Sequence, residues 1–420
     1  MADGIGANGR ERLVHWSAHM NVVSIVFAAS VGLVAPRDGA VVDLLPASQR
    51  VVLAQPNQSS RRAAAVCEAG PWGVAAPLAL VWKAEGGLTG PWKVRIATDA
   101  ELRNGMDFHI LAKDLVPRYD GICRYEVPRA NLMPGRRYWW RVWGAARCSV
   151  WECGSTVCPK GCACGKTGPA PASETWSFTT ADAAPRWIAL EGRIANIRDM
   201  GGWRTTDGRR IRRGIAFRGQ ALNDDSVNGE AAGRNRLTAE DVRYMTETLG
   251  IKTDLDLRTQ SEIADMKASP LGPSVRFVHN SSLAYKEIFL PEGMEAMARN
   301  VRLFCDRGNL PVLFHCIGGA DRTGSLAYVL NGVCGVGKED LERDWESTFY
   351  PDIPEVLENT SGVPFPESTY WRSSRHFDEG FAKYPGATLK DRIEAYLVDC
   401  GVTREEIEKL RSVLLEEAVE

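Results

Sequence analysis

A cysteine and an arginine stand six residues apart in the segment His315-Cys316-Ile317-Gly318-Gly319-Ala320-Asp321-Arg322-Thr323-Gly324. A glycine-bearing loop of this length that runs into a helix can direct successive backbone N–H groups at one centre, where the helix N-terminus adds partial positive charge. An oxyanion such as a phosphate group suits that environment. The spacing therefore predicts a phosphate-binding loop formed by Ile317, Gly318, Gly319, Ala320, Asp321 and Arg322.

The side chains of this segment indicate a chemistry for the bound phosphate. Cys316, surrounded by N–H dipoles and near a guanidinium, is expected to be a thiolate at neutral pH and a nucleophile toward phosphorus. Arg322 offers a planar fork of donors to two phosphoryl oxygens. Thr323 can donate its hydroxyl to the departing sulfur, and His315 can order the loop and support the thiolate. The alternative is a structural cysteine in a glycine-rich turn. In that case the cysteine, the arginine, the glycines and the flanking elements would occur together by chance.

The loop needs a strand before it and a helix after it. Leu310–Phe314 is a short apolar run with branched residues and predicts a buried strand, and Ser325–Leu330 predicts a buried helix. Thr238–Leu249 begins with a Thr-x-x-Asp capping box and ends at Gly250, as a helix does. This alternation predicts an α/β fold with helices around a central sheet for residues 187–420.

Three ordered motifs resemble a known family. The run His-Cys-x5-Arg-Thr-Gly is similar to the active-site loop of the cysteine-dependent protein tyrosine phosphatases. Two further segments resemble the bacterial and fungal members grouped with the mycobacterial secreted phosphatase B. They are Asn-Ile-Arg-Asp-Met-Gly-Gly at 196–202, with Thr-Asp-Gly-Arg at 206–209, and Thr-Asp-Leu-Asp-Leu-Arg at 253–258, with Glu262 shortly after.

The resemblance implies that Cys316 is the nucleophile and that Arg322 binds phosphate. Most tyrosine phosphatases donate the leaving-group proton from an Asp in a Trp-Pro-Asp triplet, and this chain has no such triplet. Members of this group carry an Asp within the loop instead, so Asp321 is expected to be the acid of the first step and the base of the second. Asp256 is the alternative acid, and pairing with N–H groups at a strand end is its alternative role.

The remaining site residues are expected to shape the rim. Arg258 and Glu262 predict an ion pair, and Arg198 and Asp199 predict another. Ala320 stands where many relatives carry a Lys suited to multiply phosphorylated lipid head groups, so a phosphotyrosine protein or peptide is the expected substrate. Phosphoserine, phosphothreonine and phosphoinositides are the alternatives. Neither a metal nor a cofactor is expected, because Arg322 and the loop N–H groups supply the charge stabilisation.

Composition predicts a globular protein of more than one domain. The 420 residues exceed the usual single-domain size, with 44% hydrophobic and 25% charged residues. A net charge of -2 and a pI near 6.4 give no electrostatic reason to expect nucleic acid. No apolar run reaches the length of a transmembrane segment.

The first half of the chain predicts an all-β domain over residues 35–181, before a small-residue linker at Ala181–Pro185. Its runs are short, rich in aromatic and β-branched residues, and separated by turns; they are Leu78–Trp82, Trp92–Ala97, Tyr138–Trp143 and Thr175–Thr180. A β-sandwich is the simplest interpretation. The pattern from Leu132 to Val142 resembles the fibronectin type III domain, which implies a spacer or a recognition module for a surface partner or glycan.

Cysteines and the N-terminal segment bear on the compartment. Five of the eleven cysteines crowd between Cys148 and Cys164, with Cys67 and Cys123 upstream. Disulfides, which need an oxidising compartment, are preferred over zinc because paired Cys-x2-Cys knuckles are missing.

Within the N-terminal segment 1–34, the apolar run from Asn21 to Ala35 follows basic residues and resembles a signal peptide, although Ser30–Val34 could equally be a first strand. Secretion or periplasmic export is therefore favoured, and the cytoplasm is the alternative.

Overall fold

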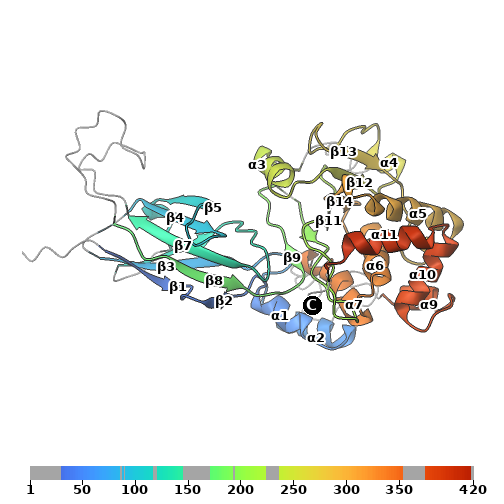
Figure 1. Ribbon diagram of the computed structural model, residues 1–420, viewed down its shortest axis with the longest axis horizontal. Helices are drawn as coiled ribbons and strands as arrows, with labels where there is room; N and C mark the ends of the chain where they lie inside the picture. Colours follow the sequence, from blue (N-terminus) through green and yellow to red (C-terminus); the bar gives the residue numbers. More distant parts are fainter. Residues whose placement is uncertain are drawn as a thin grey trace, which may run out of the picture.

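The computed structural model describes residues 30–116, 121–144, 171–223, 236–352 and 374–417, apart from residues 86, 87, 89 and 193. The molecule is elongated, with a sheet-rich part at one end and a helix-rich part at the other (Figure 1). Within these described ranges, no helix is both long and apolar enough to cross a membrane.

The helix-rich part contains a six-stranded sheet in the order β13-β12-β14-β11-β10-β9. The strands are β9 (Arg186–Trp187), β10 (Arg198–Asp199), β11 (Ala216–Gly219), β12 (Thr253–Asp256), β13 (Arg276–His279) and β14 (Val312–His315). The four strands from β13 to β11 are parallel, and β10 and β9 continue the sheet antiparallel. The predicted α/β fold of this part is confirmed.

Helices complete this part. They are α3 (Ala239–Arg243), α4 (Gln260–Ile263), α5 (Pro291–Cys305), α6 (Asp321–Val333), α7 (Lys338–Ser347), α9 (Arg375–Phe381), α10 (Leu389–Asp399) and α11 (Arg404–Leu414). The predicted capping box opens α3, where the Thr238 side chain accepts from the Asp241 N–H. A single π-helical turn at Tyr244–Thr248 continues α3 to the predicted end of the helix.

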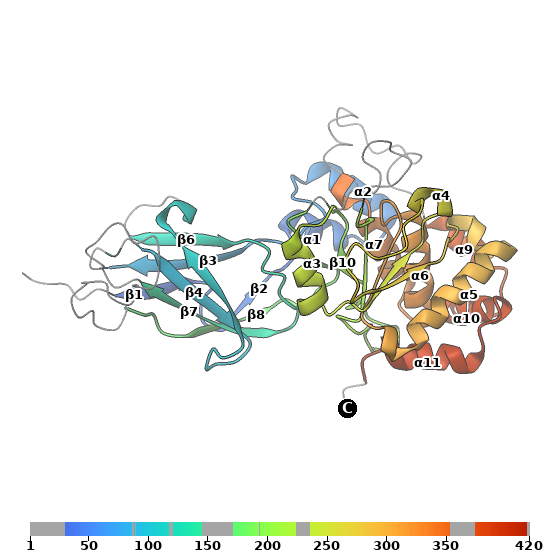
Figure 2. The same ribbon diagram turned by 90° about the horizontal axis from the view of Figure 1, so that it is seen from above.

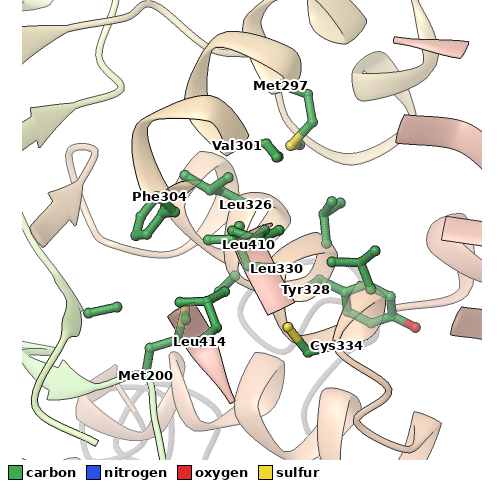
Figure 3. Packing of buried hydrophobic residues seen from close by; sticks show 14 of the residues in the cluster. Met200, Met297, Val301, Phe304, Leu326, Tyr328, Leu330, Cys334, Leu410 and Leu414 are labelled. Carbon is green, nitrogen blue, oxygen red and sulfur yellow. The ribbon is translucent and has the colours of Figure 1, made fainter. Parts of the chain in front are cut away.

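Both faces of the sheet are buried, as parallel sheets require. On β14, Val312 and Phe314 belong to one hydrophobic cluster and Leu313 to another. Helix α6 is buried from Thr323 to Val333, because α5, α7 and α10 pack around it. Figure 3 shows side chains of α5, α6 and α11 converging in the larger cluster. The start of α6, which follows the predicted loop, is thus fixed by the core.

The sheet-rich part holds two sheets that share one hydrophobic cluster. The first has the order β1-β3-β6, from β1 (Val31–Ala35), β3 (Leu78–Ala84) and β6 (Ile122–Val127). The second has the order β2-β8-β7-β4-β5, from β2 (Ala40–Val42), β4 (Trp92–Ala97), β5 (Gly105–Ile110), β7 (Arg137–Gly144) and β8 (Trp176–Thr180). All four runs predicted as strands are strands.

Strand β1 bears on the N-terminal segment. It pairs antiparallel with β3, so the strand interpretation of this segment is the one that the structure shows for Val31–Ala35. The strand also spans the predicted boundary between residues 34 and 35. The rest of the predicted signal peptide, residues 21–29, and the cysteines from Cys148 to Cys164 lie outside the described residues. Cys67 and Cys123 are free thiols in the described part.

The all-β prediction for residues 35–181 missed two helices. They are α1 (Ala47–Leu53) and α2 (Gln58–Cys67), which lie between β2 and β3. Asn57 caps α2 by accepting from the Ser60 N–H, and the alanine-rich sequence that follows is a strong helix former. This α1–α2 hairpin leaves the two sheets and lies beside α7 of the helix-rich part (Figure 2).

The predicted linker is held in place by arginines of the helix-rich part. Asp182 accepts from Arg213 at 2.9 Å and also pairs with Arg210 and Arg204. Beside it, the Asn131 side chain exchanges two hydrogen bonds with the Ala189 backbone, at 3.0 and 2.8 Å. The two parts therefore meet through specific polar contacts on both sides of the linker.

Candidate active site

The predicted phosphate-binding loop lies between β14 and α6. Cys316 directly follows β14 and is only 3% exposed, and Asp321 is the first residue of α6. Around the loop, carbonyl groups are occupied from outside. Ile317 accepts from the Ala221 N–H at 3.0 Å, and the Asn196 side-chain amide donates to the carbonyl oxygens of Gly318 and Gly319 at 3.2 and 3.3 Å.

The N–H groups of the same loop are not occupied. Within the described part of the chain, residues 317–320 donate no backbone hydrogen bond. Gly319 is buried, Ile317 and Ala320 are half-buried and Gly318 is exposed, so these four successive unpaired donors can reach an acceptor that enters from outside. The loop has the polarity of an anion-binding site.

Gly319 is required by both conformation and space. Its φ is +70°, which side chains rarely adopt, and an added Cβ would lie 2.4 Å from the carbonyl of Gly219. The tip of the loop thus rests directly against the end of β11.

A buried polar network lies beneath the loop. The Arg218 side chain donates to the Gly319 carbonyl at 3.3 Å and to Asp344 at 2.6 Å. Arg198 donates to Asn196, to the Asp344 side chain at 3.4 Å and to Thr348 at 2.8 Å. Both arginines are fully buried. The network connects α7 to the loop, and buried charges of this kind are tolerated only when paired.

The predicted rim pair between Arg198 and Asp199 is wrong. Asp199 instead pairs with Arg186 at 3.4 Å and accepts from the N–H groups of Gly201 and Gly214 at 2.9 and 2.8 Å. Neighbouring strand residues point to opposite faces, so Arg198 and Asp199 cannot meet. Arg198 therefore contacts residues that support the loop, whereas Asp199 fixes the backbone after β10 and before β11 through its hydrogen bonds to Gly201 and Gly214.

The predicted rim pair between Arg258 and Glu262 is also wrong, since each has another partner. Glu262 receives a bidentate contact from Arg322, at 2.6 and 3.1 Å. Burial alone would raise the pKa of Glu262, but donors from Arg322 and Thr259 lower it to about 2. For Arg322, burial opposes the charge, while Glu262 and Cys316 raise its pKa. The Arg322 guanidinium is therefore oriented by Glu262 and lies near the Cys316 thiol.

Asp256 and Arg258 form a closed, fully buried pair. The Arg258 Nη2 lies 2.7 Å from the Asp256 carboxylate, and the Arg258 N–H donates to it at 3.0 Å. Although burial works in the other direction, His315 and Arg258 lower the pKa of Asp256. Asp256 thus lies next to the loop strand as a buried carboxylate.

His315 is held between two carboxylates. Its Nε2 lies 2.9 Å from Asp254, and its Nδ1 lies 3.9 Å from Asp256. Burial alone would lower the pKa of His315, but Asp256 and Asp254 raise it to about 9. An imidazolium ion therefore precedes Cys316 at neutral pH.

Asp321 and Thr323 occupy the first turn of α6. The Tyr285 hydroxyl donates to the Asp321 carboxylate, and Tyr285 is held at a φ of +55° with its ring edge-on to Trp345. The Thr323 hydroxyl is buried and has no hydrogen-bond partner in the described residues. Ala320, the remaining residue of the predicted loop, is half-buried and packs against the larger cluster.

Sequence reasoning missed the residues that support the loop: Arg218, Asp254, Tyr285, Asp344 and Thr348. Two of them left a signal, because Arg218 and Asp254 are charged residues inside short strand-like runs, where an unpaired charge would be costly. The others had no local signal. No group of three or more His, Cys, Asp or Glu side chains suited to a metal ion occurs among the described residues.

The sequence from Ile188 onward is similar to that of known proteins. A family model described as the tyrosine phosphatase family matches residues 188–416. A protein of Cupriavidus necator named as a tyrosine-protein phosphatase is 27% identical over 191 residues, which cover 38% of this chain and 64% of the relative's length.

Two solved structures are similar to part of the chain. The catalytic core of the PP-IP phosphatase Siw14 from S. cerevisiae is 13% identical, with a TM-score of 0.22, over 30% of this chain and 86% of that one. TpbA of P. aeruginosa is 14% identical, with a TM-score of 0.21, over 49% of this chain and 88% of that one. Because the family model covers more than half of the sequence, the chain belongs to the tyrosine phosphatase family.

Proposed function

We propose that this protein hydrolyses phosphotyrosine in proteins or peptides through a phospho-cysteine intermediate on Cys316. One observation carries the proposal. Residues 317–319 have their carbonyl groups occupied by Ala221, Asn196 and Arg218, while the N–H groups of residues 317–320 have no partner in the described residues. Such a loop offers only donors to a ligand, and a phosphoryl group offers only acceptors.

In the first step, the Cys316 sulfur attacks phosphorus and the bond from phosphorus to the tyrosyl oxygen breaks. Asp321 gives its proton to the departing phenolate. Arg322 and the loop N–H groups stabilise the charge on the phosphoryl oxygens. Glu262 keeps the guanidinium in the orientation that two oxygens require.

In the second step, water attacks the phospho-cysteine and the bond from sulfur to phosphorus breaks. Asp321 now accepts a proton from the water, which restores its starting form. The unpaired Thr323 hydroxyl is placed one residue after Arg322 and supports the departing thiolate by donating to it. Inorganic phosphate then leaves.

Asp321 is favoured over Asp256 as the acid. Asp256 is fully buried and closed by Arg258, whereas Asp321 is partly exposed at the start of α6. We expect Asp321→Asn to slow hydrolysis of aryl phosphates with poor leaving groups much more than of those with good ones. If only Asp256→Asn produced that dependence, the acid would have to be reassigned.

Substrate choice follows from Ala320 at the loop position that carries Lys in many relatives. A neutral side chain favours an aryl monoester with a single phosphate group over a multiply phosphorylated phosphoinositide. A panel of phosphotyrosine, phosphoserine and phosphothreonine peptides and phosphoinositides tests this, with phosphotyrosine expected to give the highest kcat/KM. We also propose that the chain is related to the mycobacterial secreted phosphatase B and that it is exported from the cytoplasm.

A second role is proposed for the two N-terminal sheets, as a fibronectin-like sandwich that binds a partner. On β7, Arg137 stacks over Trp139 at 5.2 Å and Arg141 over Trp143 at 5.4 Å, which forms a basic aromatic stripe. Charge complementarity favours an acidic peptide. Arg137→Glu should weaken binding of a Glu-rich peptide without changing phosphatase activity, and failure of the unaltered chain to bind it would refute this role. The glycan predicted from the sequence has no support in the family match.

A further inference from the structure

The α1–α2 hairpin buries a charged side chain against the phosphatase part. Arg61 of α2 is fully buried and makes a bidentate contact with the carboxylate of Glu346 on α7, one arm of it at 3.1 Å. It also donates to Glu342 at 3.1 Å. In the reverse direction, Arg343 of α7 donates to the Leu53 carbonyl at the end of α1, at 2.9 Å.

Helix α7 also contacts the residues that support the phosphate-binding loop. Asp344, two residues before Glu346, accepts from Arg218, which donates to the Gly319 carbonyl. Every side chain in the series from Arg61 to Arg218 is at least nine-tenths buried. A shift of α7 would therefore move the acceptor that fixes Arg218.

A second route runs from α1 through Trp187 and does not include Arg61. The buried Gln49 side chain accepts from the Trp187 indole N–H at 2.8 Å. The Trp187 ring lies 5.4 Å from the Arg198 guanidinium, which donates to Asn196. Asn196 in turn holds the carbonyl oxygens of Gly318 and Gly319. Both routes end on the carbonyl oxygen of Gly319, and the second also reaches that of Gly318.

Apolar packing makes the hairpin a fixed part of this structure. Val52 of α1 and Ala65 of α2 share one hydrophobic cluster with Trp187 and Tyr350 of the phosphatase part. Contacts between separate domains are usually polar and permit motion, whereas burial of a charge requires an accurately placed partner. A hairpin that served only as a spacer between the two parts would not require a buried ion pair between Arg61 and Glu346.

We propose that the α1–α2 hairpin holds the phosphate-binding loop in its binding geometry, with Arg61 and Gln49 as positioning residues. This inference rests on the proposed phosphatase function, since it concerns the same loop. The N-terminal half of the chain thereby contributes to oxyanion binding and turnover from outside the α/β domain.

The test uses the full chain and matched substitutions. Arg61→Met combined with Glu346→Gln removes the pair without leaving a buried charge unpaired, so the variant should fold. Gln49→Met cuts the second route. Arg50→Met is the control, because Arg50 lies on the same hairpin and its side chain, among the described residues, pairs only with Asp43 at the surface. Two properties are measured below each variant's unfolding temperature: calorimetric affinity for inorganic phosphate, and kcat with KM for an aryl phosphate.

We expect the double variant and Gln49→Met each to lose phosphate affinity and kcat by about threefold to thirtyfold, with Arg50→Met unchanged. A lower unfolding temperature with unchanged phosphate affinity and kcat would overturn the inference, because the hairpin would then serve stability alone. The affinity for inorganic phosphate can be measured in a protein that has no hydrolytic activity, because this ligand is not turned over. An unaltered chain that binds phosphate but hydrolyses no monoester would therefore refute the proposed function only, while the inference would still be decided by the variants' phosphate affinities.

Discussion

We propose that Glu262 contributes to the reaction by directing Arg322 rather than by contacting phosphorus. Its bidentate contact fixes the plane of the guanidinium before a phosphate arrives. Glu262→Gln keeps the shape but loses the charge that orients Arg322, so kcat should fall about tenfold, which equals about 1.4 kcal/mol of transition-state stabilisation. Steady-state kinetics on an aryl phosphate measures this. An unchanged kcat would show that the loop alone orients the arginine.

His315 makes stability depend on pH in the alkaline range. Its pKa in the folded protein is about 9, above the ordinary value of 6.5. A raised folded-state pKa stabilises fully below the unfolded pKa, and the contribution is lost as the pH rises through about 9. Unfolding temperatures measured between about pH 6 and 10 should therefore decline across that window.

Asp254→Asn is the matched variant for this test. It removes the closer of the two carboxylates, at 2.9 Å from Nε2, so the pKa of His315 should drop, and the decline should be smaller and end at lower pH. Identical pH profiles for the two proteins would mean that His315 is not the group responsible.

At the residue scale, the sequence predicted the position of the loop between a strand and a helix better than the partners of its side chains. Cys316, Arg322 and the loop between them follow from local spacing, which a chain carries in its sequence. The partner of Glu262 does not, because Arg322 lies 60 residues away and is brought near only by the sheet. Spacing of four residues suggested Arg258, yet Arg258 lies in the segment after β12 and Glu262 on α4, so the helical rule did not apply.

At the element scale, the turn at Gly319 is the most constrained point of the loop. Gly319→Ala would strain a backbone at φ +70° and press a methyl group on the Gly219 carbonyl. We expect a loss of stability of at least about 1–3 kcal/mol, visible as a lower unfolding temperature. Gly318→Ala is the control for stability, since an added Cβ there meets no atom within 4 Å. Equal unfolding temperatures for the two variants would contradict the close approach.

Elements were predictable where pattern and context agreed. The strand before Cys316 and the helix after Thr323 are both buried, and their apolar runs showed it. The α1–α2 hairpin was missed because its residues are polar and alanine-rich in a region otherwise dominated by strand patterns. Its stability comes from α7 and Trp187, which are distant in sequence, so tertiary contacts rather than local periodicity define it.

At the scale of the whole molecule, the two parts should unfold together. Arg61, Asp182 and Asn131 each bridge the sheet-rich part, or the linker, to the phosphatase part, and one hydrophobic cluster spans both. Differential scanning calorimetry of the full chain should therefore show one cooperative transition. Two well-separated transitions would mean that the junction contributes little to either part.

The proposed mechanism requires that Cys316 carry the phosphoryl group during turnover. The most direct measurement is mass spectrometry of peptides from an acid-quenched reaction of Asp321→Asn with an aryl phosphate that has a good leaving group, because loss of the base slows hydrolysis of the intermediate. We expect one added phosphoryl group on the peptide that contains Cys316, and neither label nor activity in Cys316→Ser. Label on another residue, or full activity in Cys316→Ser, would contradict it.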